Sequence, residues 1–473
     1  MADIYPNPLQ QLFDAFAEEG AELYLVGGAV RDWALGEAIE QIDDLDFCTD
    51  ARPRRTKSIL EDHRFQTYDL GFEFGTVGCL LRGPDDKGYP KDCQITTYRS
   101  DEYYRRGSRH PEVEFGDTIE QDLGRRDFSI NSMALDGRGE LTDPYDGRED
   151  LEEGILRVIG DPSETLAEDP LRILRVGRFM SKLGFEPNDQ LRQASYERAD
   201  HLLEISRERW LQEMTKLVAG PHPTRAFHFL HTVRALGIML PEVARLAEWD
   251  GREDEPAAPP WSDTLEMLER ADAQPALRWG ILLHAIGKPW ARLQHPDGRV
   301  DYRRYADHGA MLFDGIRKRF RFDNDTADEV ASIIGNHVDL PDPLPGEWSD
   351  RAVRQFVRQM DPYVETMIDF ARASLTTDET DDRPAALASL EALEEQIDRL
   401  DRRADLRPQL PTGLGNELMA TLELEPSPLI GELKTFLEEE IVAGRLENGR
   451  DARYYVDRLQ NDPPGFLRDA MAP

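Results

Sequence analysis

The sequence predicts an α+β head followed by an all-helical remainder. Strand-like apolar stretches alternate with helical patterns within residues 1–140, which is typical of a sheet with helices beside it. Beyond Asp161, apolar residues recur at helical spacing between prolines and glycines, and no later stretch has the pattern of a strand. The 473 residues are enough for about three domains of ordinary size.

Local patterns give the elements of the head. Apolar residues at helical spacing predict a helix over Leu9–Glu18, and the run Glu22–Gly28 predicts a strand that ends in two glycines. The elements expected next are a short helix at 30–35, strands at 44–48, 76–81 and 94–98, and a helix at 53–62. Turn-forming residues at 83–91 predict a hairpin tip, and the polar stretch 100–111 predicts a loop.

The chain is strongly acidic. It carries 57 Lys+Arg against 93 Asp+Glu, for a formal net charge of -36, and only eight of the basic residues are lysines. Nucleic-acid binders usually have the opposite charge, so a polyanion would have to meet a local basic patch. This composition would suit a protein adapted to concentrated salt, because salt screens charge repulsion; an acidic protein without that adaptation is the alternative.

The cysteines and the apolar runs bear on location. Cys48, Cys79 and Cys93 are odd in number and lie in strand-like apolar surroundings, which predicts buried, reduced thiols. The first twenty residues lack a basic leader, and no apolar run reaches the ~18 residues of a membrane span. We therefore expect a cytoplasmic protein with no membrane partner, and the oligomeric state stays open.

Two short patterns in the head point to phosphate and metal chemistry. Gly27 and Gly28 would let backbone N–H groups approach a phosphate, and Arg31 and the start of a helix add positive charge; an ordinary turn is the alternative. Asp44 and Asp46 share one face of the expected strand and repel each other unless a cation lies between them. Two carboxylates suit Mg²⁺, which keeps its other positions for water and phosphates. A solvated acidic turn is the alternative there.

Five ordered motifs carry a family resemblance. The residues Gly27-Gly28-Ala29-Val30-Arg31-Asp32, followed by Asp44-Leu45-Asp46, resemble the nucleotidyltransferase signature of the polymerase-beta superfamily. The branch is the one that holds bacterial tRNA CCA-adding enzymes and poly(A) polymerases. The further motifs are RRDFSINSMA at 125–134, DPYDG to DL at 143–151, EDPLRILR at 168–175 with Arg178 and Phe179, and ISRERWLQEMTK at 205–216. The resemblance implies a nucleotidyltransferase head with a mixed sheet and flanking helices, followed by an all-α neck, body and tail.

The fourth motif bears on nucleotide choice. Glu168, Asp169 and Arg172 would share one helix face, where a salt-bridge ladder is the simplest interpretation. A carboxylate beside a guanidinium also offers an acceptor next to donors, which matches cytosine and adenine and rejects uracil and guanine. The resemblance assigns that role to Asp169 and Arg172. It also implies that Arg175 and Arg178 help to hold the nucleotide.

The second motif offers further nucleotide contacts, and one strand residue of the head departs from the family pattern. Asp127 and Asn131, four residues apart if the segment is helical, could contact sugar or phosphate, with Arg126 as a phosphate partner. A surface ion pair is the alternative. Where the family has a carboxylate in an E-V-T-T-F-R strand, this chain has Gln94. A third metal-binding carboxylate is therefore either absent or supplied by Asp92.

The helical half resembles a degenerate HD-type phosphohydrolase domain. The residues LLHAIGKP at 282–289 are similar to the LLHDIGKP signature, but the aspartate has become Ala285, and Asp263 stands where such domains have an upstream histidine. Without these ligands a divalent site should not assemble, so we expect residues 261–340 to be a scaffold without hydrolase activity. The region 410–452 is similar to the C-terminal helices of bacterial members; core packing and contact with the tRNA elbow both explain it.

These observations give an expected organisation. Stretches at 254–260, 341–347 and 378–382 are the expected joints. The expected domains are a nucleotidyltransferase head at 1–140, a helical neck with the nucleotide-selecting helix at 141–255, an HD-like domain at 256–345 and a tRNA-contacting tail at 346–473.

The resemblance implies a Mg²⁺-dependent enzyme that adds C and A to the tRNA 3′ end from CTP and ATP. Addition of CC only or of A only, and poly(A) synthesis, are alternatives within that class. An HD-type phosphohydrolase and a non-catalytic RNA-binding protein are the alternatives of another class.

Overall fold

The computed structural model describes residues 5–83, 88–103, 112–249, 260–295, 300–302, 304–339, 348–375, 383–402, 408–422, 424–464 and 467. It divides into two compact units, one of Met1–Ala244 with Arg319–Arg321, the other of Arg245–Lys318 with Phe322–Pro473. The expected joints at 254–259, 341–347 and 378–382 lie outside the described residues. Among the described residues, no helix combines the length and apolarity that a membrane span requires.

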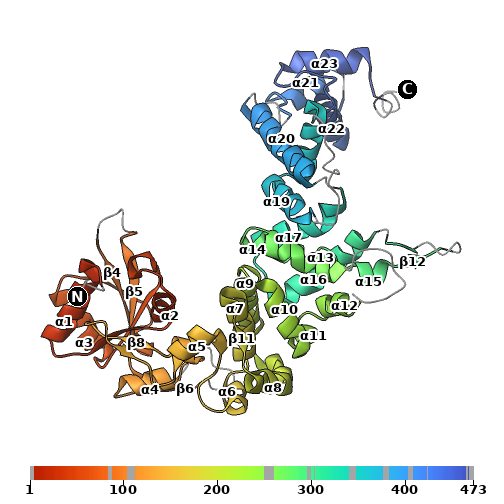
Figure 1. Cartoon of the computed structure of the whole chain (residues 1–473). Helices are drawn as coiled ribbons and strands as arrows, with labels where there is room; N and C mark the ends of the chain where they lie inside the picture. Colours follow the sequence, from red (N-terminus) through yellow and green to blue (C-terminus); the bar gives the residue numbers. More distant parts are fainter. Residues whose placement is uncertain are drawn as a thin grey trace. The chain divides into compact units, whose positions relative to one another are not determined.

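The head is built on a seven-stranded sheet, coloured red to orange in Figure 1. In spatial order its strands are β3 (Gln66–Asp69), β4 (Thr76–Leu81), β5 (Lys91–Thr97), β2 (Leu45–Thr49), β1 (Leu23–Val26), β8 (Ala134–Leu135) and β9 (Leu141–Thr142). β2 and β5 pair in parallel, whereas the other neighbours are antiparallel. The expected mixed sheet is therefore confirmed.

Helices flank this sheet. The helices of the head are α1 (Asn7–Glu18), α2 (Gly28–Ala34), α3 (Pro53–Asp62) and α4 (Ile119–Gly124). α1 and α3 lie side by side (Figure 1). α1 buries one apolar face, where the ring of Phe13 meets that of Phe47 on β2 at 5.8 Å. α3 and β4 begin and end at the expected residues, because Pro53 starts the first and glycines or turn residues bound the second.

Two expectations about strands were wrong. Within the stretch 100–111, expected to be a loop, β6 (Arg99–Tyr103) pairs with β7 (Glu112–Phe115), while residues 104–111 lie outside the described part. Short strands also occur in the helical part, where β10 (Ile155–Leu156) pairs with β11 (Glu186–Pro187) and β12 (Leu293–Gln294) with β13 (Val300–Asp301). The hairpin of β6 and β7 is rich in polar residues and so lacks the alternating apolar pattern of a strand. The other strands have two residues each, which is too short to show a period of two.

The neck is helical, as expected. Its helices are α5 (Gly147–Glu153), α6 (Pro162–Glu168), α7 (Arg172–Leu183), α8 (Asp189–Arg198), α9 (Arg207–Val218), α10 (Pro223–Thr232), α11 (Ala235–Met239) and α12 (Pro241–Trp249). α7 packs against α9 and α10. A Cβ at Gly177 would lie 2.9 Å from Leu217, so this glycine permits the close approach of α7 and α9.

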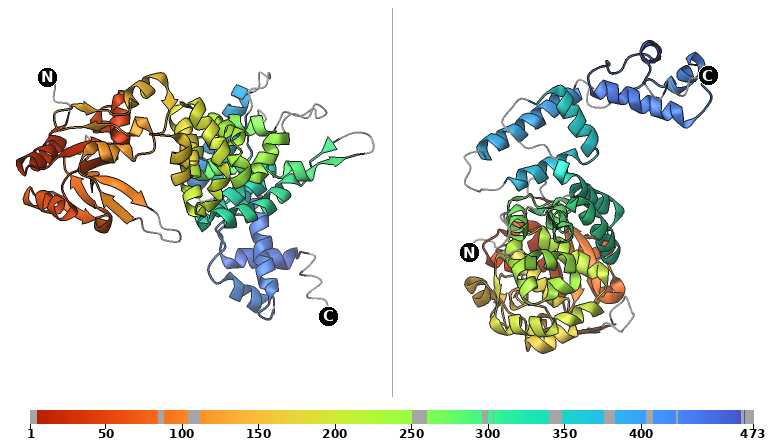
Figure 2. Two further views of the ribbon diagram at one scale, coloured as in Figure 1. Left: turned by 90° about the horizontal axis from the view of Figure 1, so that it is seen from below. Right: turned by 90° about the vertical axis from the view of Figure 1, so that its right-hand side faces the viewer.

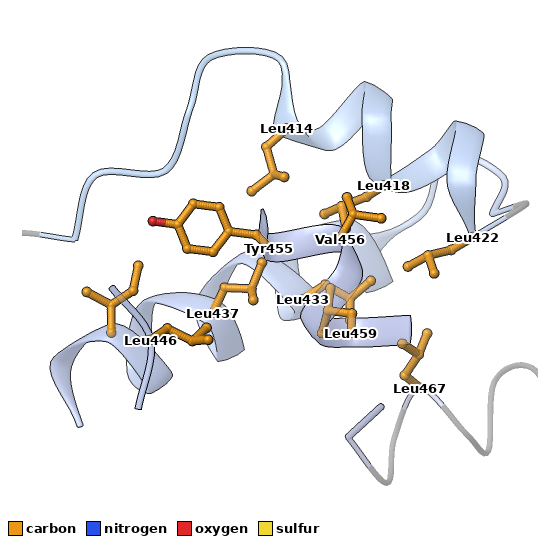
Figure 3. Packing of buried hydrophobic residues seen from close by; sticks show 11 residues of the cluster. Leu414, Leu418, Leu422, Leu433, Leu437, Leu446, Tyr455, Val456, Leu459 and Leu467 are labelled. Carbon is orange, nitrogen blue, oxygen red and sulfur yellow. The ribbon is translucent and has the colours of Figure 1, made fainter. Parts of the chain in front are cut away.

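The second unit is also helical (Figure 2). Its helices are α13 (Pro260–Arg270), α14 (Pro275–Leu283), α15 (Lys288–Ala291), α16 (Tyr305–Phe320), α17 (Asn324–Asn336), α18 (Asp350–Met360), α19 (Val364–Ser374), α20 (Arg383–Arg402), α21 (Leu414–Thr421), α22 (Pro428–Val442) and α23 (Ala452–Asn461). The last three helices form their own core. There Leu418, Leu433, Leu437 and Tyr455 are fully buried (Figure 3), so packing alone explains the apolar spacing of this region.

Candidate active site

A pocket of about 670 Å³ lies in the first unit, between the head and α7. The sequence-predicted site residues that line it are Gly27, Gly28, Arg31, Asp44, Asp46, Arg126, Asp127, Asn131, Asp169, Arg172, Arg175 and Arg178. They are the whole predicted set. Residues up to 151 positions apart in the chain thus meet at one site, which local sequence patterns alone could not require.

The glycine turn forms one wall of the pocket. Gly27 has a φ of 70°, a conformation that favours glycine, and α2 begins directly after it. A Cβ would lie 3.0 Å from Arg126 at Gly27 and 3.5 Å from Arg31 at Gly28. At Gly27 the absence of a Cβ lets the Arg126 guanidinium lie close to the backbone, whereas a Cβ at Gly28 would make only an ordinary contact with Arg31. The two guanidinium groups give this wall positive charge, which suits a phosphate.

Asp44 and Asp46 face the same pocket. β2 begins at Leu45, so Asp44 precedes the strand, whereas Asp46 belongs to it. Desolvation raises the pKa of Asp46 above its ordinary value; the Arg126 guanidinium lowers it, and the charge of Asp44 raises it further. Two neighbouring carboxylates are suited to a divalent cation, which would relieve the repulsion between their charges.

A third carboxylate does not join them. Gln94 on β5 lies opposite Asp46 in the parallel ladder. Asp92 shares the strand face of Gln94, but it accepts a 2.9 Å hydrogen bond from the Tyr68 hydroxyl and does not line the pocket. In the described part of the chain, no group of three or more His, Cys, Asp or Glu side chains could hold a metal ion. Of the two possibilities for the third carboxylate, the structure favours its absence.

Arg126 is held by a residue that the sequence reasoning missed. Asp122 on α4 is 1% exposed and accepts bonds from Arg126 at 2.9 Å, from Arg125 at 3.4 Å and from the Arg99 backbone N–H at 3.2 Å. Burial opposes its ionisation, but Arg126 and Arg125 hold the pKa of Asp122 below its ordinary value. The available signal was its position three and four residues before the two arginines, on one helical face.

Asp127 and Asn131 connect the head to α7. Asn131, in a 3-10 turn at Ser129–Asn131, donates to Asp127 at 3.0 Å and accepts from Arg31 at 2.7 Å. The other oxygen of Asp127 forms a 2.5 Å ion pair with Arg175. Burial opposes ionisation of Asp127, but Arg175 and the Asn131 hydrogen bond hold its pKa below the ordinary value. These side chains form a continuous polar chain along the pocket.

The expected helix through the fourth motif is wrong. α6 ends at Glu168 and α7 begins at Arg172, with Asp169 in an extended conformation between them. Pro170 explains the break, because the residue before a proline avoids the helical region. Asp169 therefore does not share a helix face with Arg172, although both line the pocket and Glu168 still lies 3.7 Å from Arg172.

Contacts outside the motif hold the two selecting residues. Asp169 accepts from the Leu171 backbone N–H at 3.1 Å and from Arg209 on α9 at 2.9 Å. Arg172 donates to the carbonyls of Thr165 at 3.2 Å and Arg125 at 3.4 Å. Both groups are thus oriented before any nucleotide arrives.

The sequence patterns also missed Lys182, which lines the pocket, and Glu213, the partner of the predicted Arg178. Arg178 pairs with Glu213 on α9 at 3.4 Å, and Lys182 at the end of α7 pairs with Asp32 on α2 at 3.3 Å. Among the pocket residues, seven are basic and seven are acidic. The lining is therefore neutral in a chain of net charge -36, and this is the local relief from negative charge that a polyanionic ligand requires.

The HD-like signature lies in the second unit. The His284 and His337 rings lie 5.2 Å apart, and the Tyr305 hydroxyl lies 2.7 Å from His337 Nε2. Burial, and then the neighbouring His337, lower the pKa of His284 well below its ordinary value. Ala285 offers no ligand at the position of the usual aspartate, and two histidines alone leave a divalent site incomplete.

Comparison with known proteins identifies the family. Residues 23–157 match a family model described as the poly A polymerase head domain, and residues 184–246 match one described as a probable RNA and SrmB-binding site of polymerase A. A CCA-adding enzyme from Geobacillus thermodenitrificans is 32% identical over 339 residues, which are 71% of this chain and 72% of that relative. The chain belongs to the CCA-adding enzyme family. A Streptococcus suis CCA-adding enzyme extends the match to 458 residues at 29% identity, or 94% and 96% of the two chains.

Solved structures of the CCA-adding enzyme family share the fold. The Bacillus stearothermophilus CCA-adding enzyme in complex with CTP matches with a TM-score of 0.67 at 26% identity, over 97% of this chain and 99% of that one. The Thermotoga maritima CCA-adding enzyme complexed with tRNA_CCA matches with a TM-score of 0.54 at 19% identity, over 98% and 97%. Nucleotidyltransferases of this family use a divalent metal ion, and Asp44 and Asp46 are suited to hold one.

Proposed function

We propose that this chain adds C and A nucleotides to the 3′ end of tRNA, with CTP and ATP as substrates and Mg²⁺ as cofactor. The observation that carries the proposal is the convergence of all the motif residues on one pocket. Family membership supports the same reaction, since the relatives that match most of this chain are CCA-adding enzymes.

The reaction is an in-line displacement at the α-phosphate by the tRNA 3′-hydroxyl. Asp44 and Asp46 would hold the metal. A bound Mg²⁺ would supply Lewis acidity there, which would favour loss of the 3′-hydroxyl proton to solvent and would stabilise the negative charge on the pyrophosphate that leaves. Gly27, Gly28 and Arg31 would bind the triphosphate, and Arg31 is already oriented by its bond to Asn131. The chemistry then depends on position more than on any proton carrier in the protein.

Arg126 and Asp127 would bind the phosphate and sugar of the incoming nucleotide. Arg126 lies against the Gly27 turn and is held from behind by Asp122, so it presents a fixed positive charge. Asp127 and Asn131 lie beside it, and Arg175 neutralises Asp127. A nucleotide that enters would exchange some of these bonds for its own.

Nucleotide choice would rest on Asp169 and Arg172. A carboxylate accepts the amino group of cytosine or adenine, and a guanidinium donates to the adjacent ring nitrogen. Uracil and guanine present a carbonyl to the carboxylate and a ring N–H to the guanidinium, so both contacts become repulsive. Because Arg209 and the Leu171 N–H fix the Asp169 carboxylate, the base meets an oriented acceptor. Arg175 and Arg178 would hold the rest of the nucleotide.

We also propose a cytoplasmic location. The three cysteines are free and buried, which suits a reducing compartment, and tRNA maturation would take place there.

The deciding experiment uses two substrates, a tRNA that lacks CCA and a tRNA that ends in CC. The protein is incubated with Mg²⁺ and CTP, ATP, UTP or GTP singly and then with CTP and ATP together, and products are resolved at single-nucleotide length. Two additions with CTP and a third only after ATP is present support full CCA addition. A stop after two C residues in the presence of ATP indicates a CC-adding enzyme. Additions on a tRNA that already ends in CC, but not on one that lacks CCA, indicate an A-adding enzyme. Long A tracts would indicate poly(A) synthesis, and no product with any combination would contradict the proposal.

A further inference from the structure

Lys91 is a buried lysine that belongs to none of the motifs. It is 4% exposed, although lysine is among the residues least often buried. It is the first residue of β5, and the alternation of that strand places it on the buried face with Cys93 and Ile95. Its charge must therefore be satisfied inside the head.

The hydrogen bonds and the ion pair of the ammonium go to one short segment, and the ammonium also lies 6.0 Å from the centre of the Tyr89 ring. Lys91 Nζ donates to the carbonyl of Glu40 at 2.7 Å and to that of Ile42 at 2.6 Å, and lies 3.8 Å from the Asp43 carboxylate. These acceptors belong to the turn at residues 39–41 and the residues directly after it. Ammonium groups have three N–H donors, so the segment provides most of what this buried charge requires.

That segment leads into the metal-binding pair and is not part of the sheet. The ladder between β2 and β5 begins with the pair Leu45 and Cys93, so Asp44 precedes the first paired residue. Lys91 lies two residues before Cys93 on β5 and reaches the chain upstream of Asp44. Its side chain therefore extends the connection between the two strands beyond the point where backbone pairing ends.

We propose that Lys91 is a positioning residue that orders residues 40–44 before the metal and the nucleotide bind. This inference rests on the proposed function of Asp44 and Asp46 as metal ligands. An ordered segment loses little conformational freedom when its carboxylates bind a cation, whereas a loose one must be ordered at the moment of binding. Lys91 thus acts on metal affinity through the backbone and touches no substrate.

The first test measures metal binding without turnover. Free Mn²⁺ is counted by electron paramagnetic resonance during titration of the full chain, for wild type, Lys91→Met and Lys91→Arg. Lys57→Met is the matched control, because Lys57 is an exposed lysine of α3 whose ammonium lies 3.7 Å from the Glu61 carboxylate and does not line the pocket. We expect Lys91→Met to weaken Mn²⁺ binding about tenfold. Lys91→Arg should recover most of the affinity, and Lys57→Met should retain it.

A kinetic measurement separates positioning from general damage. The Mg²⁺ concentration for half-maximal CTP incorporation should rise about tenfold in Lys91→Met, in step with the Mn²⁺ result, while KM for tRNA stays at the wild-type value. A folded Lys91→Met protein that binds Mn²⁺ as tightly as wild type would overturn the inference. If the wild type binds Mn²⁺ but adds no nucleotide, the proposed function is wrong. The Mn²⁺ titration of Lys91→Met still tests the role of Lys91 in that case.

Hydrogen exchange on the wild-type protein decides the case if Lys91→Met does not fold. The amides of Gln41 and Ile42 donate within the turn at 2.8 and 3.3 Å, so they should be protected in the metal-free protein. Rapid exchange that slows only when Mn²⁺ is added would mean that the metal, and not Lys91, orders the segment. That result would also overturn the inference.

Discussion

Replacing Asp169 by alanine tests how the pocket chooses its nucleotide. The Asp169 carboxylate lies between α6 and α7, lines the pocket and is fixed by Arg209 at 2.9 Å and by the Leu171 N–H at 3.1 Å. Asp169→Ala removes the acceptor for the amino group of cytosine and adenine. It also removes the negative charge that repels the carbonyls of uracil and guanine, whereas Arg172 keeps its bonds to Thr165 and Arg125.

The size of the effect follows from these contacts. A lost charge-assisted hydrogen bond is worth about 1.5–3 kcal/mol, which is roughly ten- to a hundredfold or more in relative efficiency. The stability cost is smaller. The Asp169 and Arg209 side chains are 31% and 35% exposed, and partly exposed pairs of this kind contribute at most ~1 kcal/mol. The variant should therefore fold, so that a change in nucleotide choice can be measured.

The assay is kcat/KM for all four nucleotides on a tRNA that lacks CCA. We expect CTP and ATP efficiency to fall by at least tenfold and the CTP-to-UTP ratio to fall with it. Glu164→Ala is the control, because it removes the same charge from the exposed side of α6. An unchanged CTP-to-UTP ratio in a folded Asp169→Ala protein would refute the argument and leave Asp169 as a structural partner of Arg209.

Three further predictions concern the rest of the pocket. Asp44→Ala or Asp46→Ala should abolish nucleotide incorporation, while the circular dichroism spectrum and the affinity for tRNA stay at wild-type values. Wild-type incorporation rates in either variant would exclude a metal site there. Gln94→Glu adds a carboxylate opposite Asp46 and should retain or increase activity at low Mg²⁺, whereas a severe loss would show that this strand tolerates no charge. Asp122→Asn removes the buried counter-charge of Arg126, whose side chain is 20% exposed and lines the pocket, so it should cost about 1.5–3 kcal/mol of stability and weaken CTP binding. Calorimetric titration and thermal unfolding would measure both effects, and unchanged values would contradict this prediction.

Sequence patterns predicted best the ends of single helices and strands and the residues that belong to the motifs. α3 and β4 were placed correctly because a proline or glycines mark their ends, and the glycine turn before α2 follows from the same kind of signal. The motif residues could be named because each motif keeps its spacing in the chain. Their meeting at one pocket depends on tertiary packing, which spacing does not specify.

The features that the sequence did not predict depend on backbone conformation or tertiary contacts, which residue spacing does not specify. The EDxxR spacing predicts a continuous helix, but the preference of the residue before Pro170 for extended conformations prevailed and moved Asp169 out of it. Asp122 resembled any acidic residue near two arginines. Its burial, which makes the contact strong, depends on Cys48 and β6 packing around it. Lys91 gave no signal because its acceptors are backbone carbonyls, which every residue carries.

The charge of the pocket reconciles an acidic chain with an anionic substrate. Arg126, Arg175 and Arg178 each already face a carboxylate, from Asp122, Asp127 and Glu213. These carboxylates lower the local positive potential, but they also hold each guanidinium in a fixed direction, so little side-chain freedom is lost when a phosphate arrives. Arginine suits this task better than lysine, because its planar group can keep one carboxylate and still present donors to a second anion. The scarcity of lysine and the paired arginines of the pocket are therefore consistent with one design, in which orientation of the positive charges matters more than their excess.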